Sequence, residues 1–332
     1  MLLLVSFFFA CSYLFQGKED LKKVAKEGKV KDLSSKLQIS AFKMTRRNWN
    51  AIEKNPNIER IEFDSEVHAF PLFRGGAGDN KHEDEEMSSG QNRRRLTEET
   101  PYGITMVEAD QFGDLPAPTG NIEICVIDTG YDLGHEDLPA SGVNGITPQN
   151  IPSGQTWDVD GHGHGTHCAG TIGAIGGNGK GVTSVNPDPT NFSFFIGKGL
   201  SDSGSGYTSD ILDAAQACAA NGAKIISMSL GGGSPSQNAA DIYDDLFQNE
   251  DVLIIAAAGN GGNSGLSYPA SYDSIMSVAA VDSNGNKAGF SQWNEQVVSK
   301  LSPASIVSPD GISIVLTWYL RHRTFLIPTY SL

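Results

Sequence analysis

Short apolar runs, spaced along the chain from about residue 97, constrain its fold more than any other feature. Five of them read as buried strands: Ile122 to Ile127, Phe192 to Ile196, Lys224 to Met228, Val252 to Ala257 and Ile275 to Ala279. Such near-continuous apolar strands are typical of a parallel sheet that is covered on both faces.

A helical pattern separates the third strand from the second. One helical face carries Ile211, Leu212, Ala215, Cys218 and Ala219. We expect Ser209 to cap its start and Asn221-Gly222 to end it. Strands that alternate with helices in this way predict an α/β domain with right-handed crossovers.

Charge divides the chain into two unequal parts. Residues 18–60 contain twelve Lys and Arg against six Asp and Glu, so this stretch carries +6 and the remainder −21 of the total −15. The two parts therefore attract each other. The acidic body argues against nucleic-acid binding, which needs a basic face.

Two segments with unusual composition, residues 1–15 and 71–96, mark boundaries between regions of the chain. Residues 1–15 are apolar, too few to span a bilayer and about the length of a signal-peptide core, so we expect a secreted protein without a transmembrane anchor. Residues 71–96 are Gly-rich, then acidic, then basic, and indicate an exposed linker. Its Arg93-Arg94-Arg95 suits a processing protease or is a plain solvated charge run.

Cysteine usage indicates neither a disulfide framework nor a zinc knuckle. Outside the leader the chain has Cys125, Cys168 and Cys218, at wide spacings. At most one disulfide can form among them, and we expect buried free thiols.

Two segments carry candidate catalytic groups. Asp128 ends the first predicted strand, in Asp128-Thr-Gly, where an acid is either catalytic or a loop anchor. His162, His164 and His167 follow within six positions. A metal site is the alternative for these histidines, although the glycines between them leave the backbone loose.

Four ordered blocks make the resemblance specific. They are Asp128-Thr-Gly, His164-Gly-Thr-His-Cys-Ala-Gly-Thr, Ser227-Met-Ser-Leu-Gly-Gly and Ala256-Ala-Ala-Gly-Asn-Gly. In this order they resemble the signature blocks of the subtilisin-like serine proteases, and the similarity extends over about residues 97–297. It implies a three-layer α/β domain with a mostly parallel sheet, and no cofactor for catalysis.

The resemblance also assigns roles. It implies that His164 is the general base and then the general acid, that Asp128 orients it, and that Asn260 donates to the oxyanion. Substrate would bind as an added strand, in a cleft whose remaining candidates are Gly204, Ser205, Gly206, Ser229, Leu230, Gly231 and, in the first specificity pocket, Ala257 and Gly259. Asp137 would hold a structural calcium with the loop of residues 176–179.

The basic N-terminal part resembles the inhibitory propeptide of the same family. The similar segments are residues 39–45, 51–58 and 61–70. They imply a small ferredoxin-like domain over residues 16–70 whose tail, Glu66 to Phe70, blocks the cleft. Its first strand would have to come from Ser12 to Phe15, inside the expected leader, so those two expectations compete.

No catalytic serine follows. The family places it in a Gly-Thr-Ser-Met-Ala block that opens a buried helix, whereas residues 298–332 match nothing in that pattern, and neither Ser313 nor Ser331 has a suitable setting. Loss of a whole buried helix favours a truncated or frame-shifted reading frame over an evolved inactive homologue.

We therefore expect the precursor of a monomeric endopeptidase that acts on proteins and peptides with broad specificity, inactive in this form. The alternatives are an inactive peptide-binding decoy, or an inhibitor of related proteases through the propeptide.

Overall fold

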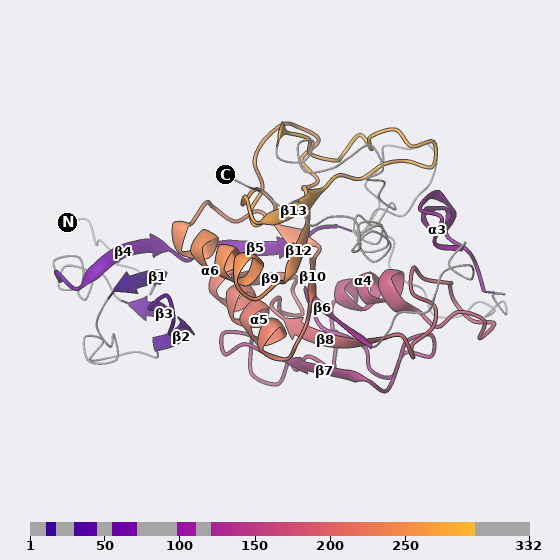
Figure 1. The fold of residues 1–332 in the computed structure, drawn as a ribbon, viewed down its shortest axis with the longest axis horizontal. Coiled ribbons are helices and arrows are strands. Elements are labelled where there is room, and N and C mark those ends of the chain that lie inside the picture. Colours follow the sequence, from indigo (N-terminus) through magenta and orange to yellow (C-terminus); the bar gives the residue numbers. More distant parts are fainter. Residues whose placement is uncertain (1–10, 18–29, 45–54, 72–97, 111–120, 296–332) are drawn as a thin grey trace, which may run out of the picture.

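A computed structural model describes residues 11–17, 30–44, 55–71, 98–110 and 121–295. They form a large α/β body and a small N-terminal sheet that lies beside it, with residues 66–69 reaching into the large body (Figure 1). None of the helices in these ranges is long and apolar enough to cross a membrane.

The large body is built on a six-stranded parallel sheet. The strand order is β13-β12-β10-β6-β8-β7, and every neighbouring pair is parallel. All five strands predicted from the sequence are present, with ends that differ by at most two residues; β7 was not predicted. The strands are β6 (Ile122–Asp128), β7 (Val143–Ile146), β8 (Phe192–Lys198), β10 (Ile225–Met228), β12 (Leu253–Ala257) and β13 (Ile275–Val278).

Helices cover both faces of this sheet, which confirms the three-layer prediction (Figure 1). Alternate strand residues enter two separate cores: Cys125 and Ile127 pack toward α5 (Thr208–Ala220) and α6 (Gln237–Gln248), while Ile124 and Val126 pack toward α4 (His164–Gly173). The short α3 (Tyr102–Met106) lies at the edge of the body.

Helix α5 has the expected end but not the expected start. Asn221 is its C-cap and Gly222 follows at φ +93°, as predicted. The Ser209 cap is wrong, because Tyr207 precedes the helix and Ser209 lies in its first turn, where both its N–H and its hydroxyl donate to Asp64.

The expectation of buried free thiols is wrong for two of these three cysteines. Cys125 on β6 and Cys218 on α5 form a disulfide. Their positions face each other across one core, which the sequence spacing of 93 residues does not reveal. Cys168 is free and buried.

The small N-terminal sheet has four antiparallel strands in the order β2-β3-β1-β4. One of its two inner strands, β1, contains the Ser12 to Phe15 segment that the propeptide resemblance required, so a leader ending at residue 15 would remove most of this strand. The segments between these strands, residues 18–29 and 45–54, lie outside the described residues. The strands are β1 (Cys11–Gly17), β2 (Val30–Ser34), β3 (Ile39–Met44) and β4 (Ile58–Phe63).

Opposite charges join the small sheet to α5 and α6. Lys31 lies 3.2 Å from Asp210 and 2.9 Å from Asp213, and Arg60 lies 2.8 Å from Asp241. The basic and acidic parts identified in the sequence therefore meet face to face.

Two acids of the small part bind helix N-termini. Glu62 accepts from the backbone of Gln237 and Asn238 at 2.9 Å each, at the start of α6. Asp64 accepts from Ser209 at the start of α5. Helix N-termini carry unpaired N–H groups and partial positive charge, so both carboxylates stabilise the contact.

Candidate active site

The predicted site residues gather at one edge of the sheet. Asp128 is the last residue of β6, Ser229 directly follows β10, and Asn260 comes three residues after β12. These three strands are adjacent and parallel, so their carboxyl ends meet. Clefts outside the carboxyl ends of parallel strands are where α/β domains bind ligands.

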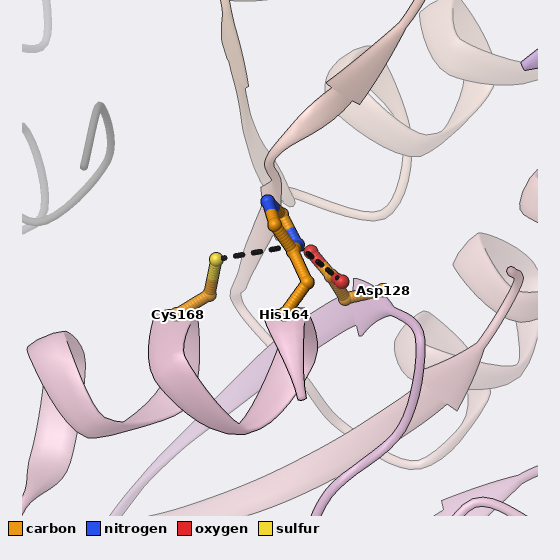
Figure 2. Close-up of side chains that lie close together, drawn as sticks. All are labelled: Asp128, His164 and Cys168. Carbon is orange, nitrogen blue, oxygen red and sulfur yellow. Dashed lines mark hydrogen bonds and ion pairs between the residues drawn. The ribbon is translucent and has the colours of Figure 1, made fainter. Parts of the chain in front are cut away.

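Asp128 and His164 form a buried hydrogen-bonded pair (Figure 2). The Nδ1 atom of His164 lies 2.7 Å from Oδ1 of Asp128, and the two side chains are 2% and 0% exposed. The backbone N–H of Thr129 donates to the same Oδ1 at 2.7 Å. Because Nδ1 faces the carboxylate, Nε2 is the ring atom left to exchange a proton with substrate or nucleophile.

The electrostatics of this pair stabilise positive charge on the imidazole ring of His164. Burial alone lowers the pKa of His164, but the charge of Asp128, together with Cys168 and the hydrogen bonds to both groups, outweighs burial and raises that pKa above its ordinary value. A base that accepts a proton during the reaction gains from this stabilisation.

Asp160 fixes the segment that presents the pair. Its carboxylate accepts from the Oγ of Thr129 at 2.8 Å and from the N–H and Oγ of Thr166 at 2.8 and 2.7 Å. Thr129 follows Asp128, and Thr166 lies in the first turn of α4, which begins at His164. One carboxylate therefore ties both members of the pair together, although sequence reasoning gave it no role.

Cys168 was also missed as a site residue. It lies one helical turn after His164, with its sulfur 3.7 Å from His164 Nδ1 (Figure 2). The same sulfur lies 3.1 Å from Ser229 Oγ. Burial and the Asp128 charge raise the pKa of its thiol. The i, i+4 spacing from His164 was the available signal, because such residues share a helix face.

The three histidines do not gather at one point. His164 is buried, whereas His162 and His167 are exposed. Within the described ranges, the one group whose candidate metal-binding atoms lie within 4.8 Å of one another is Asp128, His164 and Cys168.

Both predicted substrate-binding segments flank an extended strand of the N-terminal part. β5 (Glu66–Ala69) pairs antiparallel with β9 (Ser205–Tyr207) on one side and β11 (Leu230–Gly231) on the other. Two further backbone hydrogen bonds extend this pairing beyond β9 and β11. The N–H of Ala69 donates to Gly204 O at 2.8 Å, and the N–H of Phe70 donates to Ser229 O at 3.1 Å. Gly206 pairs with Val67.

Two side chains of this strand enter the body. Val67 is 2% exposed and lies at a pocket formed by residues that include Ile211, Tyr268 and Tyr272. The ring of Phe70 lies against Gly231, where any Cβ atom would collide with it. The segment thus places Val67 in a pocket and Phe70 against the backbone of Gly231.

Asn260 contacts the segment that follows this strand. Its Nδ2 donates to the carbonyl oxygen of Pro71 at 3.5 Å. Ala257, the last residue of β12, and Gly259 are both buried, and Gly259, at φ +115°, packs against Gln292. The pocket role of Ala257 and Gly259 stays a prediction.

Asp137 contacts the loop that the sequence paired with it. Its two carboxylate oxygens accept from Asn178 Nδ2 at 2.7 Å and from Val182 N at 3.0 Å. Residues 296–332, including Ser313 and Ser331, lie outside the described residues.

Comparisons with known proteins agree with this geometry. A model of the "Subtilase family" matches residues 119–310, which includes Asp128, His164 and Asn260 and runs past residue 297, the expected end of the domain. Subtilisin DY of Bacillus licheniformis is 37% identical over 222 residues, covering 66% of this chain and 74% of that protein.

Two further relatives show how much of the length is shared. An alkaline protease of Alkalihalobacillus alcalophilus is 32% identical over 282 residues, which cover 85% of this chain but 62% of the relative. The crystal structure of the psychrophilic subtilisin-like protease Apa1 from the Antarctic psychrotroph Pseudoalteromonas sp. AS-11 has a TM-score of 0.54 and 45% identity, over 60% of this chain and 45% of that one. The chain therefore spans less than two thirds of the length of each of these two proteins.

Proposed function

Because the chain belongs to the subtilase family, we propose that it is the precursor of a secreted, monomeric serine endopeptidase that hydrolyses proteins with broad specificity. The observation that carries this proposal is β5, which lies as an extended strand between β9 and β11 and leads to Pro71, whose carbonyl oxygen accepts from Asn260. In this proposal residues 16–70, together with the part of β1 before them, are the propeptide, residues 71–96 the linker, and residues 97–297 the catalytic domain.

In this proposal Asp128, His164 and Asn260 take the roles that acyl transfer requires beside the nucleophile. A serine hydroxyl placed at His164 Nε2 would lose its proton to that atom as its oxygen attacks the substrate carbonyl carbon. Asp128 holds Nδ1 and stabilises the cation that results. Asn260 donates to the oxyanion, and His164 then returns the proton to the leaving amine.

We propose that the 332-residue chain does not complete this reaction, because its sequence contains no Gly-Thr-Ser-Met-Ala block after Asn260. A fluorophosphonate probe tests this directly, since it labels an activated serine. The chain should remain unlabelled. Labelling of any serine between residues 261 and 332 would contradict the claim.

A chimera tests the family function itself. Residues after 297 are replaced by the corresponding C-terminal part of Subtilisin DY, which supplies a serine block. The chimera should bind the fluorophosphonate and hydrolyse an unfolded protein, and His164→Ala in it should abolish hydrolysis. A folded chimera that neither labels nor cleaves would refute the proposal.

Substrate preference follows from the strand in the cleft. Phe70 and Val67 suggest a large apolar residue at the position before the cut and a branched aliphatic residue three positions earlier. Pro71 follows Phe70, and a proline nitrogen has no hydrogen and a fixed φ. We therefore propose that this tail acts as a poorly cleaved inhibitor.

The residues around Asp137 fit a calcium site in chemistry but not in their present orientation. A buried carboxylate and the Asn178 amide group are oxygen-bearing ligands of the kind that calcium takes. However, Asn178 presents Nδ2 to Asp137 while its oxygen accepts from Lys180 N at 2.7 Å. A calcium ion there would require this amide to turn over.

The second candidate is a peptide-binding decoy. The paired edges of β9 and β11 favour it, because they bind backbone without any nucleophile. Inhibition of a related subtilisin by the chain that the fluorophosphonate does not label would support this role. Failure of the chain to bind peptides or that subtilisin would exclude it.

A further inference from the structure

We infer that Lys198 is a positioning residue for the Asp128–His164 pair, because its ammonium group holds Thr129, which is bonded both to Asp128 and to the residue after His164. Lys198 is the last residue of β8 and lies opposite Asp128 of β6 in the parallel sheet. Its side chain is 0% exposed. The inference rests on the proposed function, since it adds a residue to the same site.

The burial of Lys198 needs an explanation, because an ammonium group loses its hydration inside a protein. Three acceptors compensate for this loss: the carbonyl oxygen of Thr129, that of Val159 at 3.3 Å and Oδ1 of Asp202 at 2.6 Å. An apolar side chain of similar size could fill the same space without any of these bonds. The ammonium group therefore supplies directed hydrogen bonds in addition to packing.

Thr129 is a buried residue that joins Asp128 to helix α4. Its N–H donates to Asp128 Oδ1, the oxygen that faces His164, at 2.7 Å. Its Oγ accepts from the N–H of Gly165, the residue after His164, at 2.9 Å. Its carbonyl oxygen accepts from Lys198. Lys198 thus fixes a third polar group of the residue that links the carboxylate to the histidine helix.

The turn after Thr129 is packed between Lys198 and α4. Gly130 lies at φ +121°, and a Cβ atom on it would lie 3.3 Å from Lys198 Nζ and 2.8 Å from Val159 O. A Cβ atom on Gly165 of α4 would collide with Gly130 O. Removal of the ammonium group leaves the buried Thr129 carbonyl without this donor, so we expect the turn and the helix start to shift together.

Lys198 also contacts the loop that leads to the substrate-binding segment, through Asp202. That loop has hydrogen bonds of its own, from Ser201 N to Ser205 O at 2.9 Å and from Asp202 N to Gln155 Oε1 at 2.9 Å. We therefore expect loss of the ammonium group to disturb His164 more than substrate binding.

Proton NMR of the full chain tests the positioning role without any catalysis. A proton on His164 Nδ1 that is hydrogen-bonded to a carboxylate resonates downfield of the amide protons, and its exchange with water reports how firmly the bond is held. We expect this resonance in the 332-residue chain, assigned by its loss in His164→Gln. In Lys198→Met it should vanish or exchange at least about ten-fold faster. An unchanged resonance and exchange rate in folded Lys198→Met would overturn the proposal, as would absence of the resonance from the unaltered chain.

Matched variants separate positioning from general stability. Lys224 also donates to a backbone carbonyl, that of Glu250 at 2.8 Å, but it precedes β10 and lies at the opposite, amino end of the sheet. Lys224→Met should leave the His164 resonance unchanged, and an equal loss there contradicts the proposal. If Lys198→Met does not fold, Asp202→Asn removes the carboxylate that orients the ammonium group and should speed exchange about three-fold. Unchanged exchange in Asp202→Asn would then overturn the proposal.

The chimera with a serine block separates this inference from the proposed function. In the chimera, Lys198→Met should lower kcat by roughly 10- to 100-fold and leave KM within about two-fold, because a small displacement of the histidine impairs the reaction rather than binding. A raised KM with unchanged kcat would show that Lys198 supports the substrate-binding segment instead. If the chimera is inactive although the NMR results are as expected, the protease proposal fails and the positioning of the pair stands.

Discussion

Replacing Asp64 with asparagine should release the small N-terminal sheet from the large α/β body. Asp64 is fully buried and accepts from Ser209 N at 2.9 Å, Ser209 Oγ at 2.7 Å and Ser12 Oγ at 2.6 Å. Asparagine keeps the shape but removes the charge, and its NH₂ group faces two hydroxyls that must reverse.

The magnitude follows from these contacts. Three charge-assisted bonds each weaken by about 1 kcal/mol, and the interaction with the α5 N-terminus loses up to about 1 kcal/mol. Relief of the buried charge offsets part of this sum. We expect a net loss of about 2–3 kcal/mol, which is roughly a 30- to 150-fold shift toward the undocked state.

Hydrogen–deuterium exchange with mass spectrometry measures this shift locally. Amides of β1 and β3 should exchange faster by roughly that factor, with β10 and β12 unchanged. The matched control is Asp32→Asn, an exposed acid of the same sheet whose side chain accepts only from Ser35 Oγ among the hydrogen bonds described. Unchanged exchange in Asp64→Asn, or an equal effect in the control, would refute the reasoning.

Three further predictions concern the large body and its cleft. Burial raises the pKa of Asp160, but its hydrogen bonds outweigh burial and hold that pKa below its ordinary value. This carboxylate therefore stabilises the folded protein at pH values above the unfolded pKa of about 3.9. It loses that contribution as the pH falls through the folded pKa. Asp160→Asn should therefore lower the free energy of unfolding at pH 7, and the difference should shrink below about pH 4 in urea titrations at several pH values; a difference independent of pH would contradict it. Replacing both Cys125 and Cys218 with alanine removes a cross-link between residues 93 positions apart, and should lower the free energy of unfolding by about 3–5 kcal/mol in the same assay. An unchanged free energy of unfolding would contradict the disulfide. Val67→Asp should displace β5 from between β9 and β11, so that a competing apolar tetrapeptide binds more strongly in a fluorescence anisotropy assay. Unchanged binding would show that Val67 does not anchor the strand.

The sequence was informative wherever local pattern and spacing carried the physics. Runs such as Val252 to Ala257 predicted the parallel strands, because a strand buried on both faces must be apolar throughout. The ends of those strands also located Asp128 and Asn260 at one edge. By contrast, Ser209 was assigned as a cap because the sequence does not show that Asp64, 145 residues away, takes that place.

What the sequence by itself determined is the α/β body, the position of Asp128 and Asn260 at one edge of its sheet, and the opposite charges of the two parts of the chain. Only the tertiary structure decided which side chains share a space: the Cys125–Cys218 disulfide, the position of Cys168 beneath His164, and the insertion of β5 between β9 and β11. The physical reason is that periodicity and charge act over neighbouring residues or whole segments, whereas a pair of atoms a few ångströms apart depends on how distant segments pack.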